Sequence, residues 1–73
     1  GEFDIILANI NKNILIAEMH QYASYLKKGG QLLLSGFFTD DIPDLKIEAA
    51  KFNLYELAHD ERERWACLLL QKS

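Results

Sequence analysis

The residues best placed to do chemistry are an asparagine and a serine–glycine pair, each at the end of an apolar segment. Asn9 comes near the end of residues 3–10, and Ser35 and Gly36 follow three consecutive leucines in residues 31–38. Ligands of open α/β sheets bind beyond the carboxyl ends of the parallel strands. There an amide can donate and accept hydrogen bonds, and a glycine permits close approach. Both segments can equally be simple turns, because Asn, Ser and Gly are common where strands end.

The other polar residues indicate structural or solvated positions. His20 has no second metal ligand at a suitable spacing, and His59 stands beside a charged segment. Cys67 has apolar neighbours, which predicts a buried, unreactive thiol. Residues 60–64 alternate in charge sign, which is typical of a solvated turn rather than of paired catalytic carboxylates. Without a Gly-rich phosphate loop, a nucleophile elbow or a Cys-x-x-Cys pair, residue types alone leave the enzyme class open.

Strands and helices are expected to alternate in the first half of the chain. Consecutive apolar residues in 3–10 and 31–38 are typical of strands buried on both faces. The segment between them predicts an amphipathic helix that is capped near Asn11 and ends at Gly29 and Gly30. Its apolar stripe has spacings of four, three and four: Leu15, Met19, Tyr22 and Leu26.

The second half predicts another helix and a hairpin. A second apolar stripe, ending at Asn53, consists of Ile42, Leu45, Ala49 and Phe52. Residues 54–59 and 65–70 are predicted strands, and the short connection at 60–64 permits only antiparallel pairing. The expected order is therefore strand, helix, strand, helix, strand, strand.

This order leaves one face of the sheet without a helix. Strand–helix–strand crossovers are right-handed in about 98% of cases, so a sheet that grows in one direction carries both helices on one face. Neighbouring strand residues point to opposite faces, and the apolar residues at 5–8 and 32–34 need cover on both. We therefore expect a piece of a larger α/β domain, or a chain covered by a partner, and self-association of the isolated piece.

Composition narrows the functional class. The chain has 73 residues, of which 49% are hydrophobic and 26% charged, as expected for globular protein. A net charge of −3 argues against direct binding of nucleic acid, which needs clustered Lys and Arg. The single cysteine favours a reducing, cytoplasmic location. No segment indicates a membrane span or a signal peptide.

Four short motifs are shared with a known enzyme family. They are Asp-x-x-x-Ala-Asn-Ile at residues 4–10, Leu-Lys-x-Gly-Gly at 26–30, Leu-Ser-Gly at 34–36, and a loosely spaced Glu and Trp at 61–65. Together they resemble the C-terminal half of the methyltransferases that modify large-subunit ribosomal protein eleven. The resemblance extends over essentially the whole chain.

The resemblance implies an α/β fold: the C-terminal half of a Rossmann-like, seven-stranded methyltransferase sheet with an antiparallel last hairpin. Residues 1–73 would then form a C-terminal fragment of the catalytic domain, with no second domain. The family's Gly-rich cofactor loop, its ribose-binding acid and its N-terminal substrate domain have no counterpart in this sequence. Alone, the chain is therefore expected to lack most of the cofactor site and to be inactive.

The resemblance also assigns roles to the strand-end residues. Ala8, Asn9 and Ile10 would contact the cofactor, S-adenosyl-L-methionine, and Asn9, Ser35 and Gly36 would bind an amine of the ribosomal protein substrate. Asn9 would be catalytic, because an amide oxygen orients the attacking amine without strongly favouring its ammonium form, as a carboxylate would. No metal is expected.

A second interpretation belongs to a different class. The chain can be a non-catalytic α/β half-domain that serves as an assembly or nucleotide-binding module, with Asn9 and Ser35 as turn residues only. A Gly-rich loop about two strands upstream of Phe3 in the parent gene would favour the methyltransferase. Its absence there would favour the module.

Overall fold

The chain forms a mixed sheet of four strands with two helices packed on one face. The computed structural model describes residues 1–73. The elements are β1 (Phe3–Asn9), α1 (Lys12–Tyr25), β2 (Leu26–Phe38), the 3₁₀ turn η1 (Thr39–Asp41), α2 (Ile42–Ala50), β3 (Leu54–Arg62) and β4 (Trp65–Lys72). The expected order of strands and helices is confirmed.

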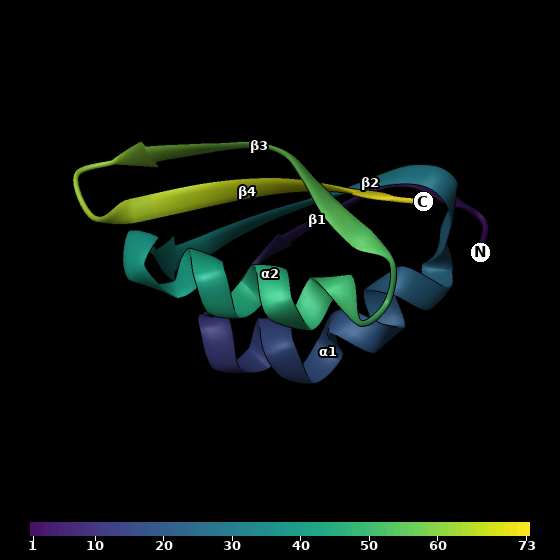
Figure 1. Cartoon of the computed structure of the whole chain (residues 1–73), viewed down its shortest axis with the longest axis horizontal. Coiled ribbons are helices and arrows are strands. Elements are labelled where there is room, and N and C mark those ends of the chain that lie inside the picture. The colour runs from purple at the N-terminus through teal and green to yellow at the C-terminus, as the bar shows by residue number, and fades with distance from the viewer.

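The strand directions bring three carboxyl ends to one edge. The order across the sheet is β1-β2-β4-β3, with β1 parallel to β2 and β4 antiparallel to both of its neighbours. Strand β3 therefore runs in the same direction as β1 and β2 (Figure 1). This mixed α/β sheet, with an antiparallel last hairpin, is the predicted fold.

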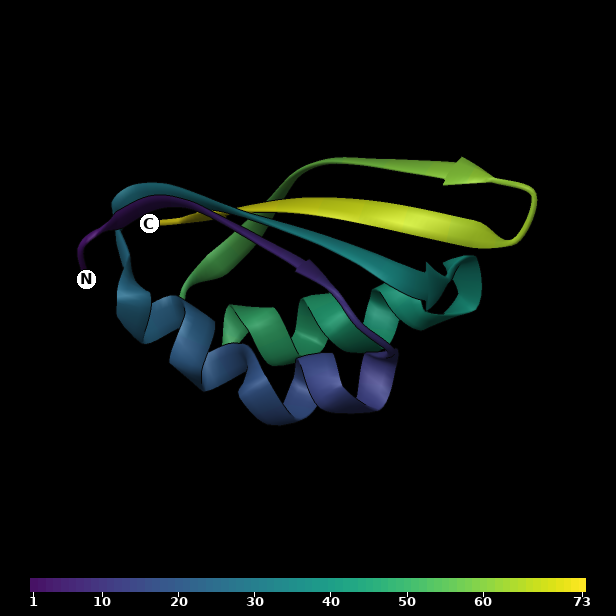
Figure 2. The ribbon, with the colours of Figure 1, turned by 180° about the vertical axis from the view of Figure 1, so that it is seen from behind.

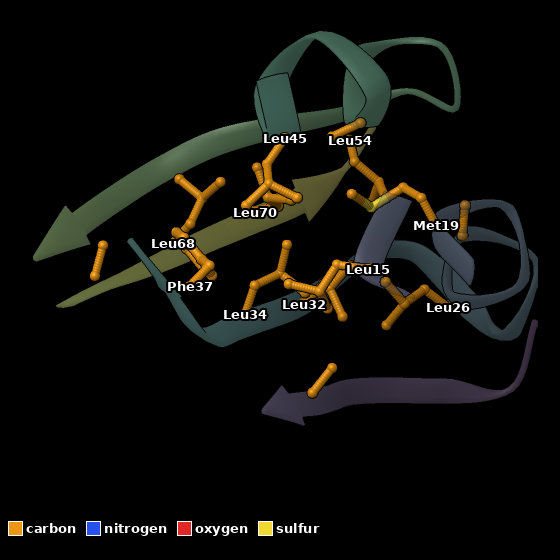
Figure 3. Packing of buried hydrophobic residues seen from close by; sticks show 14 residues of the cluster. Leu15, Met19, Leu26, Leu32, Leu34, Phe37, Leu45, Leu54, Leu68 and Leu70 are labelled. Atoms are coloured by element: carbon orange, nitrogen blue, oxygen red, sulfur yellow. The ribbon is translucent and has the colours of Figure 1, made fainter. Parts of the chain in front are cut away.

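Both helices lie on the same side of the sheet, as Figure 2 shows from behind. The core fills the layer between the sheet and the helices. It consists of alternate strand residues and the apolar stripes of the two helices (Figure 3). Its large side chains, each less than 2% exposed, are Phe37, Leu15, Met19, Leu26, Leu32, Leu34, Leu45, Leu54, Leu68 and Leu70. Burying one such side chain fully is worth roughly 1.5–3 kcal/mol. Neither helix is long and apolar enough to cross a membrane.

The opposite face of the sheet carries exposed apolar side chains. On β1, Ala8 is buried against the helices, whereas Ile5 and Leu7 are 60% and 72% exposed. Leu7 is in register with Leu33 of β2, which is in register with Leu69 of β4. Directly opposite residues share a face, so an aliphatic row crosses the side that has no helix. The expectation of one uncovered face is confirmed.

The first helix ends earlier than the sequence predicts. Its last residue is Tyr25, and β2 begins at once with Leu26, so the expected helix end at Gly29 and Gly30 is wrong. Two contacts from distant parts of the chain accompany this end: Leu26 pairs with Phe3 of β1, and Lys72 from the end of β4 reaches the last carbonyls. Lys72 Nζ donates hydrogen bonds to the carbonyls of Ala23, at 2.6 Å, and of Leu26, at 3.1 Å. A cation there satisfies free carbonyls and suits the negative end of the helix.

The hairpin strands are longer than predicted. Strand β3 continues through most of the charged segment to Arg62, and only Glu63 and Arg64 form the turn. Thr39 holds this turn, because its backbone N–H and its hydroxyl donate to the Arg64 carbonyl at 2.9 and 3.3 Å. The predicted end of β3 at His59 is therefore wrong. Charged side chains remain compatible with a strand here because β3 lies at the edge of the sheet.

The exposed face leads to a first prediction. The isolated chain should associate as its concentration rises and should bind a dye specific for apolar surface. Ile5→Thr should weaken both effects with little loss of stability, because Thr is also β-branched and Ile5 lies on the open face. Ile6→Thr is the matched control: Ile6 packs against the core, so this change should lower the free energy of unfolding. Sedimentation velocity and dye fluorescence measure the association. A dye-free monomer at high concentration would contradict the prediction.

Candidate functional site

A cleft of about 650 Å³ opens at the carboxyl ends of β1 and β2. One wall is formed by residues 9–11 together with Ser35 and Gly36. The other is formed by the hairpin, from residues 60–62 of β3 and 65–67 of β4. Figure 1 shows why the two walls meet: the hairpin extends past the ends of β1 and β2 at the same edge of the sheet. The cleft therefore lies where the parallel strands predict a ligand site.

Four polar residues, one on each strand, lie side by side in the lining of the cleft. Asn9 is in register with Ser35 of β2, and Ser35 with Cys67 of β4. Cys67 is in turn in register with Asp60 of β3. Because opposite residues of neighbouring strands share a face, the four form one polar row across the open face of the sheet. The aliphatic row of Leu7 lies next to it.

Gly36 leaves room for the Asn9 side chain. It lies at an irregularity in the pairing of β2 with β4 and has a φ of +88°, which side-chain-bearing residues rarely adopt. A Cβ atom at Gly36 would stand 2.5 Å from Asn9 Oδ1 and 3.1 Å from the backbone nitrogen of Ile10. That nitrogen donates to the Ser35 carbonyl at 3.1 Å. The absence of a side chain at Gly36 thus makes room for the Asn9 amide.

The start of α1 is organised by Asn11 and not by Asn9. Asn11 Oδ1 accepts a hydrogen bond from the Ile14 backbone nitrogen at 3.1 Å, which is a standard N-cap. Asn9 is exposed and takes no part in this cap. The hydrogen-bonding groups of its amide are therefore available to a ligand in the cleft.

An ion pair fixes the segment that follows Asn11. Lys12 Nζ donates to Asp44 Oδ2 at 3.0 Å and lies 3.9 Å from Asp41 Oδ1. The hydrogen bond from Lys12 and the charge of Asp44 raise the pKa of Lys12 above its usual value, because both favour the ammonium form. These contacts join the first turns of α1 and α2 next to the cleft.

The predicted site residues are mostly brought together. Asn9, Ile10, Ser35 and Gly36 line the cleft. The side chain of Ala8 is 6% exposed and belongs to the core, so only its main chain can face a ligand.

Two expectations about the remaining residues are wrong. Cys67 is exposed and lines the cleft, because its register places it on the open face while its neighbours Ala66 and Leu68 face the helices. Residues 60–62, expected in a solvated turn, are exposed as expected, but they belong to β3 instead of a turn and line the cleft. The structure places them there because β4 pairs with β2, so the hairpin reaches the edge where β1 and β2 end.

Both histidines make local contacts outside the cleft. His20 lies against Phe52, with ring centroids 6.4 Å apart. His59 Nδ1 is 2.8 Å from Glu56 Oε2, and Lys46 Nζ is 2.9 Å from Glu56 Oε1. The hydrogen bonds from His59 and Lys46 lower the pKa of Glu56 below its usual value. No group of three or more His, Cys, Asp or Glu is arranged to hold a metal ion.

Comparison with known proteins identifies the family. The sequence pattern of the family described as "Ribosomal protein L11 methyltransferase (PrmA)" matches residues 1–73. The chain belongs to this family. Proteins named ribosomal protein L11 methyltransferase include relatives from Bacteroides fragilis and Bacteroides thetaiotaomicron, 46% and 48% identical over 68 residues. Each alignment covers 93% of this chain and 24% of the relative, so the chain spans about a quarter of their length.

A solved structure extends the likeness to the fold. The ribosomal protein L11 methylase of Lactobacillus delbrueckii subsp. bulgaricus superposes on the whole chain with a TM-score of 0.90 and 30% sequence identity. The match covers 38% of that protein. The α/β arrangement of this L11 methyltransferase family member therefore corresponds to part of a larger methylase structure.

The contact between Gly36 and Asn9 generates a second prediction. Gly29 has nearly the same φ, +87°, but nothing lies within 4 Å of a Cβ placed there. Gly29→Ala should therefore cost only the backbone strain, about 1–2 kcal/mol. Gly36→Ala should cost that amount plus roughly 1–3 kcal/mol of overpacking. Urea unfolding measures both changes.

A double-mutant cycle isolates the cause. If the clash is with the amide, adding Asn9→Ala to Gly36→Ala should restore part of the lost stability. The restoration should be incomplete, because the Ile10 backbone would still crowd the new methyl group. Equal costs at the two glycines, or strict additivity in the cycle, would contradict this account.

Proposed function

We propose that residues 1–73 form the C-terminal part of the catalytic domain of an S-adenosylmethionine-dependent protein N-methyltransferase. The enzyme methylates amines of a ribosomal protein. The observation that carries this proposal is the exposed Asn9 amide, which occupies the space left by Gly36 and lines the cleft at the carboxyl edge of the parallel strands. Membership of the L11 methyltransferase family supports the same reaction.

The residues of the cleft fit a cationic methyl donor. Asp60, in the polar row of Asn9, places a carboxylate in the opposite wall, to which Glu61 and Arg62 also contribute. Trp65 adds an aromatic surface of the kind that attracts cations. When bound, S-adenosylmethionine supplies an electrophilic methyl group on a positively charged sulfur. Ala8, through its main chain, and Asn9 and Ile10 would hold it on the β1 side.

Asn9 orients the amine that receives the methyl group. An ammonium has no lone pair, so the site must hold the uncharged amine and aim its lone pair at the methyl carbon. The amide oxygen accepts one N–H of the amine, and Gly36, which has no side chain, leaves the space that the amide occupies. The nitrogen gains positive charge as the bond forms, so this hydrogen bond strengthens towards the transition state. Positioning of this kind contributes up to about 7–11 kcal/mol in well-oriented cases.

Ser35 and Gly36 form the neighbouring wall for the substrate. Ser35 lies between Asn9 and Cys67 in the polar row, so a substrate amine held by Asn9 would also pass the Ser35 side chain. The enzyme would act in the cytoplasm on a ribosomal protein, without binding a membrane or nucleic acid itself. The net negative charge of the chain argues against nucleic-acid binding, because phosphate backbones require clustered cations.

Substitution of Asn9 tests the catalytic assignment in the full-length enzyme that contains these residues. Asn9→Ala should lower the rate of methyl transfer by about 10²-fold, as removal of a preorganised hydrogen-bonding group does elsewhere. Cofactor affinity should change far less, because the interaction belongs to the transition state. Asn13→Ala, in an exposed part of α1, is the matched control. Single-turnover transfer and cofactor titration give the two quantities.

The pH profile of Asn9→Asp sharpens this test. A carboxylate keeps an acceptor at nearly the same place but stabilises the ammonium form of the amine. The defect of Asn9→Asp should therefore shrink as the pH rises from 7 to 10, whereas that of Asn9→Ala should not. Near-native rates for both variants at every pH would show that Asn9 is a turn residue.

A further prediction concerns how the cofactor site is divided between residues 1–73 and the rest of the full-length enzyme. Because the family's Gly-rich cofactor loop and ribose-binding acid have no counterpart in residues 1–73, the chain by itself should bind S-adenosylmethionine far more weakly than the full-length enzyme does. Isothermal titration calorimetry of both proteins makes the comparison. Micromolar binding by the 73-residue chain would overturn this division of the site.

A further inference from the structure

Two hydrogen-bond acceptors lie next to each other at the carboxyl edge of the parallel strands. Asn9 of β1 and Ser35 of β2 are in register and face the same side of the sheet. Both residues line the cleft. No side-chain hydrogen bond within the chain involves the Asn9 amide or the Ser35 hydroxyl. Both groups are therefore available to the same ligand.

The main chain holds these two side chains in a fixed relation. The backbone nitrogen of Ile10, the residue after Asn9, donates to the Ser35 carbonyl at 3.1 Å. Asn9 Oδ1 reaches towards β2, because a Cβ atom added to Gly36 would stand 2.5 Å from it. On the other side of Ser35 lies Cys67, whose thiol is only a weak hydrogen-bonding group. Asn9 is thus the stronger polar neighbour of the Ser35 hydroxyl.

An uncharged primary amine needs two acceptors to be fully oriented. Besides its bond to carbon, the nitrogen carries two N–H groups and one lone pair. A single hydrogen bond leaves the nitrogen free to turn about that bond, whereas two hydrogen bonds fix the direction of the lone pair. Two oxygens that each accept from one tetrahedral nitrogen at about 2.9 Å lie about 4.7 Å apart. Neighbouring strands are about 4.8 Å apart, so side chains in register on β1 and β2 can supply this spacing.

We propose that Ser35 is a second catalytic residue, whose hydroxyl oxygen accepts the other N–H of the amine held by Asn9. This inference rests on the proposed methyltransferase function and deepens it, because it names the substrate class that the site favours: a primary amine. The nitrogen lone pair forms the new bond to the methyl carbon, while the carbon–sulfur bond breaks and its electron pair stays on sulfur. The methylated nitrogen then carries a positive charge and releases a proton to water.

An amine that already carries one methyl group cannot use both acceptors. The uncharged secondary amine has a single N–H, which the amide oxygen of Asn9 accepts. Its methyl group then lies against the Ser35 hydroxyl, which loses its substrate partner. Replacing Ser35 by alanine therefore removes a hydrogen bond from the first methyl transfer and none from the second. Asn9→Ala, in contrast, weakens both transfers.

Two substitutions separate the Ser35 hydroxyl from the space that it fills. Ser35→Ala removes the oxygen, and Ser35→Cys keeps a side chain of similar size with only a weakly accepting sulfur. Because the hydroxyl has no partner in the chain, neither change leaves a polar group unpaired, and urea unfolding should show little loss of stability. Ser24→Ala is the matched control, because Ser24 lies on α1 and donates only to the Gln21 carbonyl, at 2.8 Å.

The test measures single-turnover methyl transfer by the full-length enzyme to two forms of ribosomal protein L11, one unmethylated and one with its amines monomethylated. Both Ser35 variants should slow transfer to the unmethylated protein by about 3- to 10-fold, the effect of one neutral hydrogen bond. Transfer to the monomethylated protein should change little, so the ratio of the two rates should fall by the same factor. Asn9→Ala should slow both transfers, and Ser24→Ala neither. Titration of the cofactor should give wild-type affinity in both Ser35 variants.

The outcomes separate this inference from the function on which it rests. A wild-type enzyme that transfers no methyl group to the unmethylated protein would overturn the proposed function, and the role of Ser35 with it. In an active enzyme, a rate ratio that does not fall in both Ser35 variants would overturn the role of Ser35 alone. A ratio that falls in both variants, with stability and cofactor affinity kept, supports Ser35 as the second acceptor.

Discussion

The parallel register of β1 against β2 is the interaction on which the site depends. It sets Asn9 opposite Ser35 and brings Gly36 to the Asn9 side chain. A slip of one residue would turn Asn9 towards the helices and move Ala8 to the open face. The register is protected because Ala8 must face the core while Leu32 and Leu34 are buried beside it. Hydrophobic packing on the helix-covered face of the sheet thus positions the polar residues Asn9 and Ser35 at the carboxyl edge of the open face.

The hairpin of β3 and β4 supplies the second wall of the cleft, opposite the ends of β1 and β2. Strand β4 runs antiparallel beside β2, so its first residues arrive at the edge where β1 and β2 end. Trp65 and Cys67 reach the cleft in this way. The charged residues of the hairpin lie on an edge strand, where charge discourages pairing with another sheet. Three of these residues, Asp60, Glu61 and Arg62, also line the cleft.

The open face and the site belong to the same side of the sheet. Leu7, Leu33 and Leu69 form the aliphatic row, and the polar row of Asn9 follows it at the carboxyl edge. Covering the aliphatic row would therefore also enclose the polar row from one side. An enclosed site has a lower local dielectric, which strengthens hydrogen bonds and charge effects on the reacting amine. This arrangement connects the uncovered aliphatic row to the chemistry proposed for Asn9.

The sequence by itself determined the order of the elements and the placement of both helices on one face of the sheet. It also determined that Asn9 meets Ser35 and Gly36. These features follow from local apolar periodicity, turn residues and strand direction. Tertiary structure alone decided the lengths of β2 and β3, the exposure of Cys67 and the hairpin wall of the cleft. Lys72 satisfies carbonyls at the end of α1, and Thr39 holds the turn at Arg64. Both contacts join residues far apart in the chain, and a single sequence carries no local signal of such partners.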